Sequence, residues 1–373
     1  MLRFLAAGLA LSIATAVVPH AATAQDKAPS TAEARAMLGA IGRVTTPDGI
    51  DVSQAIEIGG IKQWITVRGK DRRNPILLLV HGGPAAPDMP LRWLFEGPWT
   101  DYFTVVEWDQ RGAGKTMAIN DLAAVAPTIT EDRMVADAEE LVGYLRRTYG
   151  KNKIFVMGHS WGSLIGMRLA RQIPGQLYAY IGVGQIVDTR RSEKLGYDWV
   201  LAEARQDRNA KAIAELESIA PYPEANGALP LDKINIERKW SVHYGGLSYG
   251  HDSYAYLSDA QILSPDYSAA DVAAIDAGSA LSLPRLLPAM ARADFSAVDH
   301  LDCPVILFEG RHDYTIPSAV ADDWFQRLQA PDKHFVWFEN SAHMMFEEEP
   351  GKVLVSLVRY ALPLAERAAP ARE

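Results

Sequence analysis

One pentapeptide constrains this chain more than any other feature. Gly158-His159-Ser160-Trp161-Gly162 follows the apolar run 154–157 and precedes the helix-like run 163–171. A G-x-S-x-G motif between a strand and a helix is typical of a sharp turn that carries a nucleophile. Small flanking residues let the backbone adopt a strained conformation, and the helix N-terminus favours developing negative charge. We therefore expect Ser160 to be a nucleophile; the alternative is an ordinary turn with a surface serine.

The spacing of apolar runs predicts the fold class. Residues 54–67 alternate in polarity around Gly59-Gly60, which indicates a β-hairpin. The later runs are continuously apolar and alternate with helix-like segments, which favours parallel strands that are buried on both faces. These runs are 75–80, 103–108, 154–157, 180–185 and 305–309. We expect an α/β fold with a mostly parallel sheet flanked by helices, including helices at 130–148 and at 352–362, the latter ending at Pro363.

The alternation of strands and helices pauses between about 188 and 299. Charged residues and helix-like patterns are more frequent there, followed by aromatic residues that either line a site or pack together. We expect a mainly helical cap at 189–298, inserted before the strand that precedes the catalytic acid. The core then comprises 45–188 and 299–373. In open parallel sheets, ligands bind at the carboxyl ends of the strands, which the cap would cover.

A serine nucleophile needs a base, and that base needs a carboxylate to orient it. His343 lies in a short loop between the run 334–338 and the C-terminal helix, and Asp313 lies in the loop after the run 305–309. Each residue follows a strand end, and the order Ser160, Asp313, His343 is that of α/β-hydrolases. We therefore expect these three residues to form a catalytic triad.

Other polar residues nearby fit these roles less well. His312 lacks the position between a loop and a helix, and Asp302 precedes its strand, at the opposite end of the sheet. His159 is expected to pack beside the nucleophile or to line the entrance. Cys303 is the single cysteine; beside Pro304 and an apolar run, it is expected to be a buried small side chain and not a nucleophile.

A tetrahedral intermediate requires two backbone N–H donors. Trp161 follows the nucleophile and supplies one. The segment His81-Gly82-Gly83-Pro84 follows a strand, and its glycines allow close approach to the reacting atoms. We choose Gly83 as the second donor; a glycine-proline turn needed only for chain reversal is the alternative.

Composition and missing motifs exclude several classes of function. The net charge is -9 and there is no basic stripe, so we do not expect a nucleic-acid partner. The nine histidines form neither H-x-x-x-H nor H-E-x-x-H, and no complete dinucleotide or phosphate loop is present. We expect no metal and no cofactor. The expected partner is a small-molecule or short-peptide substrate, and the oligomeric state stays open.

The first residues have the pattern of an export signal. Arg3 precedes an uncharged apolar stretch at 4–18, and Ala22-Thr23-Ala24 forms an A-x-A cleavage site before Gln25. The apolar stretch is shorter than the roughly 20 residues that span a bilayer. We expect a signal peptide at 1–24, cut after Ala24, and a periplasmic or secreted protein without a membrane partner; an uncleaved anchor is the alternative.

Three motifs together resemble the prolyl aminopeptidase branch of the α/β-hydrolases: H-G-G-P at 81–84, D-Q-R-G-x-G at 109–114 and G-x-S-W-G-S at 158–163. The resemblance covers roughly 50–188 and 300–365. It implies that Ser160, Asp313 and His343 act as nucleophile, acid and base, and that Gly83 and Trp161 donate to the oxyanion. That family removes an N-terminal residue, typically proline, and glutamates in or near its cap bind the free amine. The available cap glutamates here are Glu203, Glu215, Glu217 and Glu224.

This chain departs from that family at two places. His159 stands where glycine is usual, and Ala85-Ala86-Pro87 replaces a glycine-rich loop. Both departures concern the choice of substrate. The leading hypothesis is an exported serine hydrolase of the aminopeptidase type. The alternatives are a carboxylesterase, a lactonase or another amide hydrolase on the same core, and, less favoured, a non-catalytic ligand-binding protein.

Overall fold

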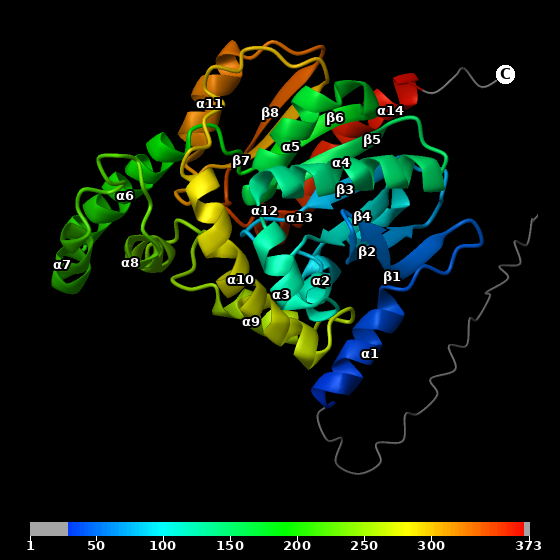
Figure 1. The fold of residues 1–373 in the computed structure, drawn as a ribbon, viewed down its shortest axis with the longest axis horizontal. Coiled ribbons are helices and arrows are strands. Elements are labelled where there is room, and N and C mark those ends of the chain that lie inside the picture. Colours follow the sequence, from blue (N-terminus) through cyan, green and yellow to red (C-terminus); the bar gives the residue numbers. More distant parts are fainter. Residues whose placement is uncertain (1–28, 369–373) are drawn as a thin grey trace, which may run out of the picture.

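The computed structural model describes residues 29–368, so the predicted signal peptide at 1–24 lies outside the described residues. An eight-stranded sheet forms the centre, with the strand order β1-β2-β4-β3-β5-β6-β7-β8 (Figure 1). Only the β1–β2 and β2–β4 pairs are antiparallel within this sheet. The strands are β1 (Ile50–Ile58), β2 (Ile61–Gly69), β3 (Ile76–Val80), β4 (Thr104–Asp109), β5 (Ile154–His159), β6 (Leu177–Val183), β7 (Val305–Gly310) and β8 (Lys333–Phe338). The predicted α/β fold with a mostly parallel sheet is confirmed.

Both faces of the sheet are buried, because alternate residues of the central strands enter different cores. In β3, Ile76, Leu78 and Val80 pack on one face, and Leu77 and Leu79 pack on the other. All five are essentially inaccessible to solvent. This explains why β3 reads as a continuous apolar run instead of an alternating one.

Helices cover the two faces of the sheet. Side chains of α4, α5 and α11 pack on the first face, and those of α12–α14 pack on the second. The helix predicted at 130–148 is α4, whose N-cap Thr130 accepts from Arg133 N. The α-helices outside the predicted cap are α1 (Thr31–Ile41), α2 (Gly114–Ala118), α3 (Leu122–Val125), α4 (Glu131–Thr148), α5 (Trp161–Gln172), α11 (Ser318–Arg327), α12 (Met345–Glu348), α13 (Pro350–Ser356) and α14 (Leu362–Ala368).

Several predicted element ends are wrong. β5 extends to His159 and not only to 157, and β6 begins at Leu177 and not at 180. β6 ends at Val183 and not at 185, because Gly184 takes a φ of 56° that a strand does not accommodate. The C-terminal helix does not end at Pro363. A π-helical turn at Leu357–Ala361 separates α13 from α14, and Pro363 lies in the first turn of α14. Proline is tolerated in a first turn, because its missing N–H is not needed there.

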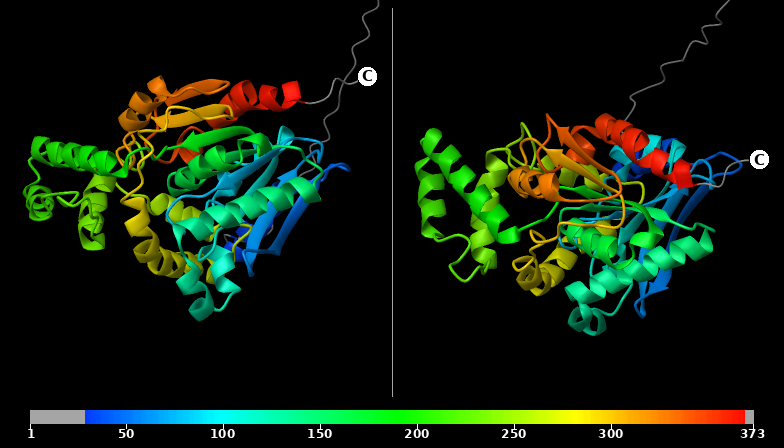
Figure 2. Two further views of the ribbon diagram at one scale, coloured as in Figure 1. Left: turned by 45° about the horizontal axis from the view of Figure 1, so that its top comes forward. Right: turned by 90° about the horizontal axis from the view of Figure 1, so that it is seen from above.

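Five helices fill the interval in which the sequence predicts the cap. They are α6 (Thr189–Gln206), α7 (Ala210–Ser218), α8 (Leu231–His243), α9 (Ala255–Ile262) and α10 (Ala269–Met290), all between β6 and β7. Helices α6–α8 stand off one end of the molecule (Figures 1 and 2) and have their own core, which includes Tyr197, Tyr222 and Trp240. Helix α10 packs against α2 of the core and also contributes Leu287 to the cluster of α6–α8.

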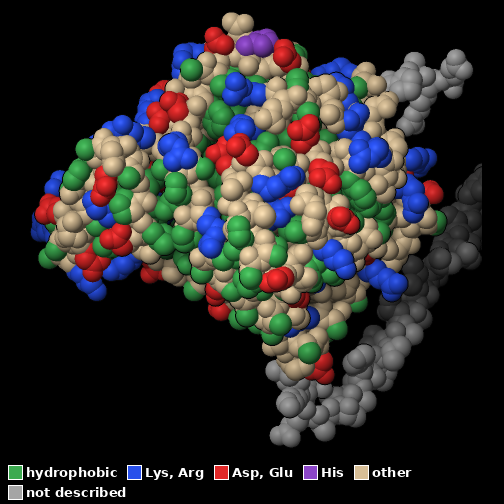
Figure 3. Space-filling view, viewed as in Figure 1, with side chains coloured by type: hydrophobic (Ala, Val, Ile, Leu, Met, Phe, Trp, Pro, Cys, Tyr) green, Lys and Arg blue, Asp and Glu red, His purple; other side chains and the backbone are tan. Residues whose placement is uncertain are grey.

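One face of the molecule shows no dominant charge (Figure 3). On the face drawn in Figure 3, basic and acidic side chains are interspersed, and apolar side chains occur between them. Within residues 29–368, no helix combines the length and apolar character that crossing a membrane requires.

Candidate active site

Ser160 occupies the sharp turn that the sequence predicts between β5 and α5, an elbow formed by residues 158–162. Its φ of 54° and ψ of -118° lie in a region that non-glycine residues rarely adopt. The flanking glycines allow this turn. A Cβ on Gly162 would lie 1.9 Å from the carbonyl oxygen of Val80, and one on Gly158 would lie 2.3 Å from that of Gly162. A side chain at Gly162 would therefore force the elbow away from β3, and one at Gly158 would force β5 away from the start of α5.

His343 and Asp313 meet in the loops after β8 and β7. Nδ1 of His343 lies 2.6 Å from Oδ2 of Asp313, and both residues are buried. The second oxygen of Asp313 accepts from Ile316 N at 2.8 Å, which fixes the carboxylate. Because a carboxylate accepts, Nδ1 carries the hydrogen and Nε2 is left as the basic nitrogen.

The end of β6 links this pair to the elbow. Ser160 N donates to the carbonyl of Val183 at 2.9 Å. The next residue, Gly184, packs so closely against the pair that a Cβ there would lie 3.0 Å from Nδ1 of His343 and 3.4 Å from Oδ2 of Asp313. The three predicted triad residues therefore share one edge of the sheet, at the carboxyl ends of β5, β7 and β8.

Both predicted oxyanion donors lie beside the elbow. Trp161 is the first residue of α5, where a helix leaves backbone N–H groups without intrahelical acceptors. Gly82 packs against Ser160, with a hypothetical Cβ 3.1 Å from Ser160 Cβ. Its neighbour Gly83 has a φ of 110°, and within the described residues its N–H has no backbone acceptor. These positions are compatible with the predicted roles.

Gln110 links the two segments that contain the predicted oxyanion donors, a role that sequence analysis missed. Its amide nitrogen donates to the carbonyl of His81 at 2.9 Å, and its side-chain oxygen accepts from Trp161 Nε1 at 3.1 Å. Its backbone N–H also donates to Nε2 of His81 at 3.2 Å. The D-Q-R-G motif was the signal, since it accompanies H-G-G-P in the resemblance.

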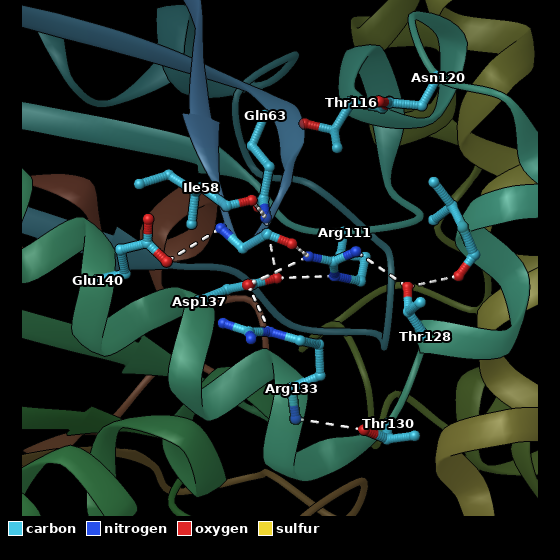
Figure 4. Close-up of polar contacts among 12 residues, drawn as sticks. Ile58, Gln63, Arg111, Thr116, Asn120, Thr128, Thr130, Arg133, Asp137 and Glu140 are labelled. Carbon is cyan, nitrogen blue, oxygen red and sulfur yellow. Dashed lines mark hydrogen bonds and ion pairs between the residues drawn. The ribbon is translucent and has the colours of Figure 1, made fainter.

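Arg111, the next residue of that motif, has a structural role. Its guanidinium contacts Asp137 at 2.8 Å and donates to the carbonyl of Gly59 and the hydroxyl of Thr128 (Figure 4). Gln63 also donates to Asp137, at 2.8 Å. This buried network fastens the loop after β4 to the β1–β2 hairpin and to α4.

Burial controls the ionisation of groups around the elbow. It lowers the pKa of His81 to about 4 and that of His159 to about 3, so both rings are neutral near pH 7. Burial also raises the pKa of Asp109 to about 7, although Tyr267 and Lys115 N donate to this carboxyl. The region is thus poorly solvated, which strengthens electrostatic interactions within it.

The weaker candidates lie apart from the triad contacts. His312 stacks on Tyr249 with ring centroids 3.9 Å apart, and Asp302 is exposed and pairs with His300. Cys303 is buried, and desolvation raises the pKa of its thiol to about 11, so it is a poor nucleophile.

The cap glutamates that the resemblance suggested are mostly engaged. Three of the four form ion pairs within the cap, and Glu203 is half-buried on α6. The pairs are Glu215–Lys239, Glu217–Arg205 and Glu224–Lys233. Among residues 29–368, no group of three His, Cys, Asp or Glu side chains is arranged to hold a metal ion.

Known proteins resemble this chain in sequence and in fold. The family model of the serine aminopeptidases, S33, matches residues 100–350. The probable aminopeptidase YbaC of Bacillus subtilis is 27% identical over 315 residues, which cover 84% of this chain and 96% of that protein. The putative carbamate hydrolase RutD of Escherichia coli O44:H18 is 22% identical over 280 residues, 74% of this chain and 86% of that protein. In fold, the chain resembles the proline iminopeptidase of Mycobacterium smegmatis, with a TM-score of 0.61 at 16% identity over 85% of this chain and 100% of that one.

Proposed function

The chain belongs to the serine aminopeptidase S33 family of α/β-hydrolases, and from this premise we propose that it is an exported serine aminopeptidase. Its substrates are short peptides, from which it removes an N-terminal residue, proline foremost. The contact between His343 and Asp313, at the same sheet edge as the strained Ser160, is the observation that carries this proposal. The relative named a probable aminopeptidase supports the choice of reaction.

The proposed reaction proceeds through an acyl-enzyme. Oγ of Ser160 attacks the carbonyl carbon of the scissile bond while Nε2 of His343 accepts the hydroxyl proton. Asp313 stabilises the imidazolium that forms, and the N–H groups of Gly83 and Trp161 donate to the oxyanion. His343 then gives its proton to the leaving amine as the C–N bond breaks. A water molecule, deprotonated by His343, releases the acyl group and regenerates the serine.

A chromogenic arylamide tests this proposal. The mature protein is expected to hydrolyse proline-β-naphthylamide, and Ser160→Ala is expected to lose this activity. Ser258→Ala, an exposed serine on α9, is the matched control and should retain it. If no amine is released from a panel of aminoacyl arylamides, the aminopeptidase proposal fails.

A carboxylesterase, lactonase or other amide hydrolase is the second candidate. The ion pairs of the cap glutamates and the relative named a putative carbamate hydrolase favour keeping it. It predicts faster turnover of esters or of amides without a free amine than of aminoacyl arylamides. A fluorophosphonate probe that fails to label Ser160 in folded protein would instead favour a non-catalytic ligand-binding protein.

Export is part of the proposal and rests on the sequence pattern at 1–24. Removal of this segment leaves a mature chain that begins at Gln25. Intact-mass analysis of the protein recovered from the periplasm or medium tests this. Retention of residues 1–24 in that fraction would contradict cleavage.

A further inference from the structure

His159 is a buried residue of the elbow to which the proposed reaction gives no role. It directly precedes Ser160, at the position where glycine is usual in the family that the motifs resemble. It is also the last residue of β5. A buried N–H group destabilises the fold unless it has an acceptor, so the acceptor that this ring uses indicates what the ring does.

The acceptor belongs to the backbone of the predicted base. Nε2 of His159 lies 3.1 Å from the carbonyl oxygen of His343. Because a carbonyl oxygen can only accept, Nε2 carries the hydrogen and donates it. The two imidazole rings are neighbours, with centroids 4.9 Å apart and planes inclined by 37°. The side chain next to the nucleophile is therefore hydrogen-bonded to the residue whose ring must act on that nucleophile.

The backbone of His343 is held at both of its polar groups. Its N–H donates to the carbonyl of Leu247 at 2.9 Å, and its carbonyl accepts from His159. Leu247 lies between α8 and α9, in the predicted cap, whereas His159 belongs to the central sheet. A third bond, from Nδ1 to Asp313 at 2.6 Å, orients the ring. Of these three bonds, the one with His159 joins the base to the elbow.

Neighbouring segments keep the ring of His159 in one orientation. A hypothetical Cβ on Gly82, in the H-G-G-P segment, would lie 3.5 Å from Nδ1 of His159, which is an ordinary van der Waals distance. The ring of Phe346, on α12, has its centroid 5.3 Å from that of His159. Close packing of this kind restricts side-chain rotation, so Nε2 stays directed at the carbonyl of His343. A glycine at position 159 would supply neither the donor nor the packing.

The ring of His159 also stays uncharged. Burial, followed by the charge of His343, lowers the pKa of His159 to about 3, so the ring is neutral near pH 7. In the proposed reaction, His343 becomes an imidazolium. A second cation at a centroid distance of 4.9 Å would repel that charge in a poorly solvated site. A neutral N–H donor instead holds the backbone of the base without opposing its protonation.

We propose that His159 is a positioning residue, which holds His343 within reach of Ser160 through this hydrogen bond. The inference rests on the proposed function only in that Ser160 and His343 act as nucleophile and base, and it does not depend on the substrate. Without this bond, His343 keeps its bonds to Leu247 and Asp313 but loses its direct hydrogen bond to the elbow. A misplacement of about 1 Å typically reduces the rate on the order of 100-fold.

Two amide side chains at position 159 separate the place of the donor from its chemistry. The amide nitrogen of glutamine has the reach of Nε2 of histidine, and that of asparagine has the reach of Nδ1. In the full mature chain, His159→Gln is expected to react with a fluorophosphonate within threefold of the parent rate. His159→Asn is expected to react at least tenfold more slowly, because its shorter amide does not reach the carbonyl of His343.

A third variant separates the hydrogen bond from the packing. His159→Phe keeps an aromatic ring beside Phe346 but removes the donor, so it should also react at least tenfold more slowly. Circular dichroism verifies that each variant is folded. If His159→Asn or His159→Phe unfolds, His159→Gln still tests the inference, because retention of the parent rate is required of it.

The outcomes distinguish this inference from the proposed function. Parent rates in His159→Asn and His159→Phe, or an equal loss in His159→Gln and His159→Asn, overturn the positioning role and leave Ser160 as the nucleophile. If the parent itself does not react at Ser160, both the serine hydrolase function and the role of His159 are overturned. A parent that reacts with the fluorophosphonate but hydrolyses no arylamide contradicts only the aminopeptidase assignment.

Discussion

Replacing Gly162 with alanine tests whether the elbow must press against β3. Gly162 is the second residue of α5, and an added Cβ would lie 1.9 Å from the carbonyl oxygen of Val80 and 2.8 Å from that of His81. Both contacts are with backbone atoms, which cannot rotate away as a flexible side chain can. Alanine is otherwise preferred to glycine in a helix by about 1 kcal/mol, so propensity alone predicts stabilisation.

The size of the overlap decides between these opposing effects. To lengthen the 1.9 Å contact to the 3.4 Å at which ordinary van der Waals contact begins, α5 or the end of β3 must move by about 1.5 Å, and overpacking of this kind costs about 1–3 kcal/mol. The same shift displaces Ser160 from its partners, and a misplacement of about 1 Å typically reduces the rate on the order of 100-fold. We therefore expect Gly162→Ala to lose about 100-fold in reactivity and to be no more stable than the parent.

The rate of labelling of Ser160 by a fluorophosphonate measures this loss without assuming a substrate, and urea unfolding measures stability. Gly351→Ala is the control, because Gly351 lies on α13 with no atom within 4 Å of an added Cβ. It should gain up to about 1 kcal/mol and keep the full labelling rate. Full reactivity of Gly162→Ala, with the stability gain of a helical alanine, would refute the close contact between the elbow and β3.

Two further substitutions test the supports of the site. Asp137→Asn leaves the buried guanidinium of Arg111 with a weaker partner, so urea unfolding should show a loss of about 3–5 kcal/mol, whereas the exposed Glu139→Gln on the same helix should change little. Asp109→Asn tests the pH dependence of stability. Burial raises the pKa of Asp109 from 3.8 to about 7, so the folded protein holds this proton more tightly than the unfolded chain. Its contribution is complete below about pH 4 and is lost as the pH rises through 7. The decrease in urea midpoint between pH 4 and 7 should therefore be smaller in Asp109→Asn, and an unchanged decrease would contradict the assignment.

The sequence predicted those features that depend on local patterns. The strand β3 was recognisable because every residue of 76–80 is apolar, and the turn at Ser160 because glycines flank it on both sides. The contact between Asp313 and His343 followed from their positions after strand ends, since parallel strands place their carboxyl ends at one edge. In each case the predictive pattern lies within a short stretch of chain, and the topology of the sheet then determines which of these stretches lie close together.

Local patterns gave the wrong result where hydrogen bonding can be rearranged over one turn. Pro363 is normally a helix terminator, but the π-helical turn at Leu357–Ala361 lets a new helical segment begin, and the proline then occupies a permitted position. Which carbonyl groups before Pro363 accept backbone hydrogen bonds decides whether the helix ends there, and no residue type near 357–361 predicts that pattern.

The cap glutamates show why the binding residues of a site are harder to predict than its nucleophile. Ser160 carries a signature because its turn requires particular neighbours in the chain, whereas the cap glutamates are ordinary acidic residues in their own segments. Their acidity and their place in the cap are all that the sequence shows, but in the folded protein three of the four pair with a lysine or an arginine. Whether a carboxylate can bind a substrate thus depends on its partners within the protein, which only the folded arrangement determines.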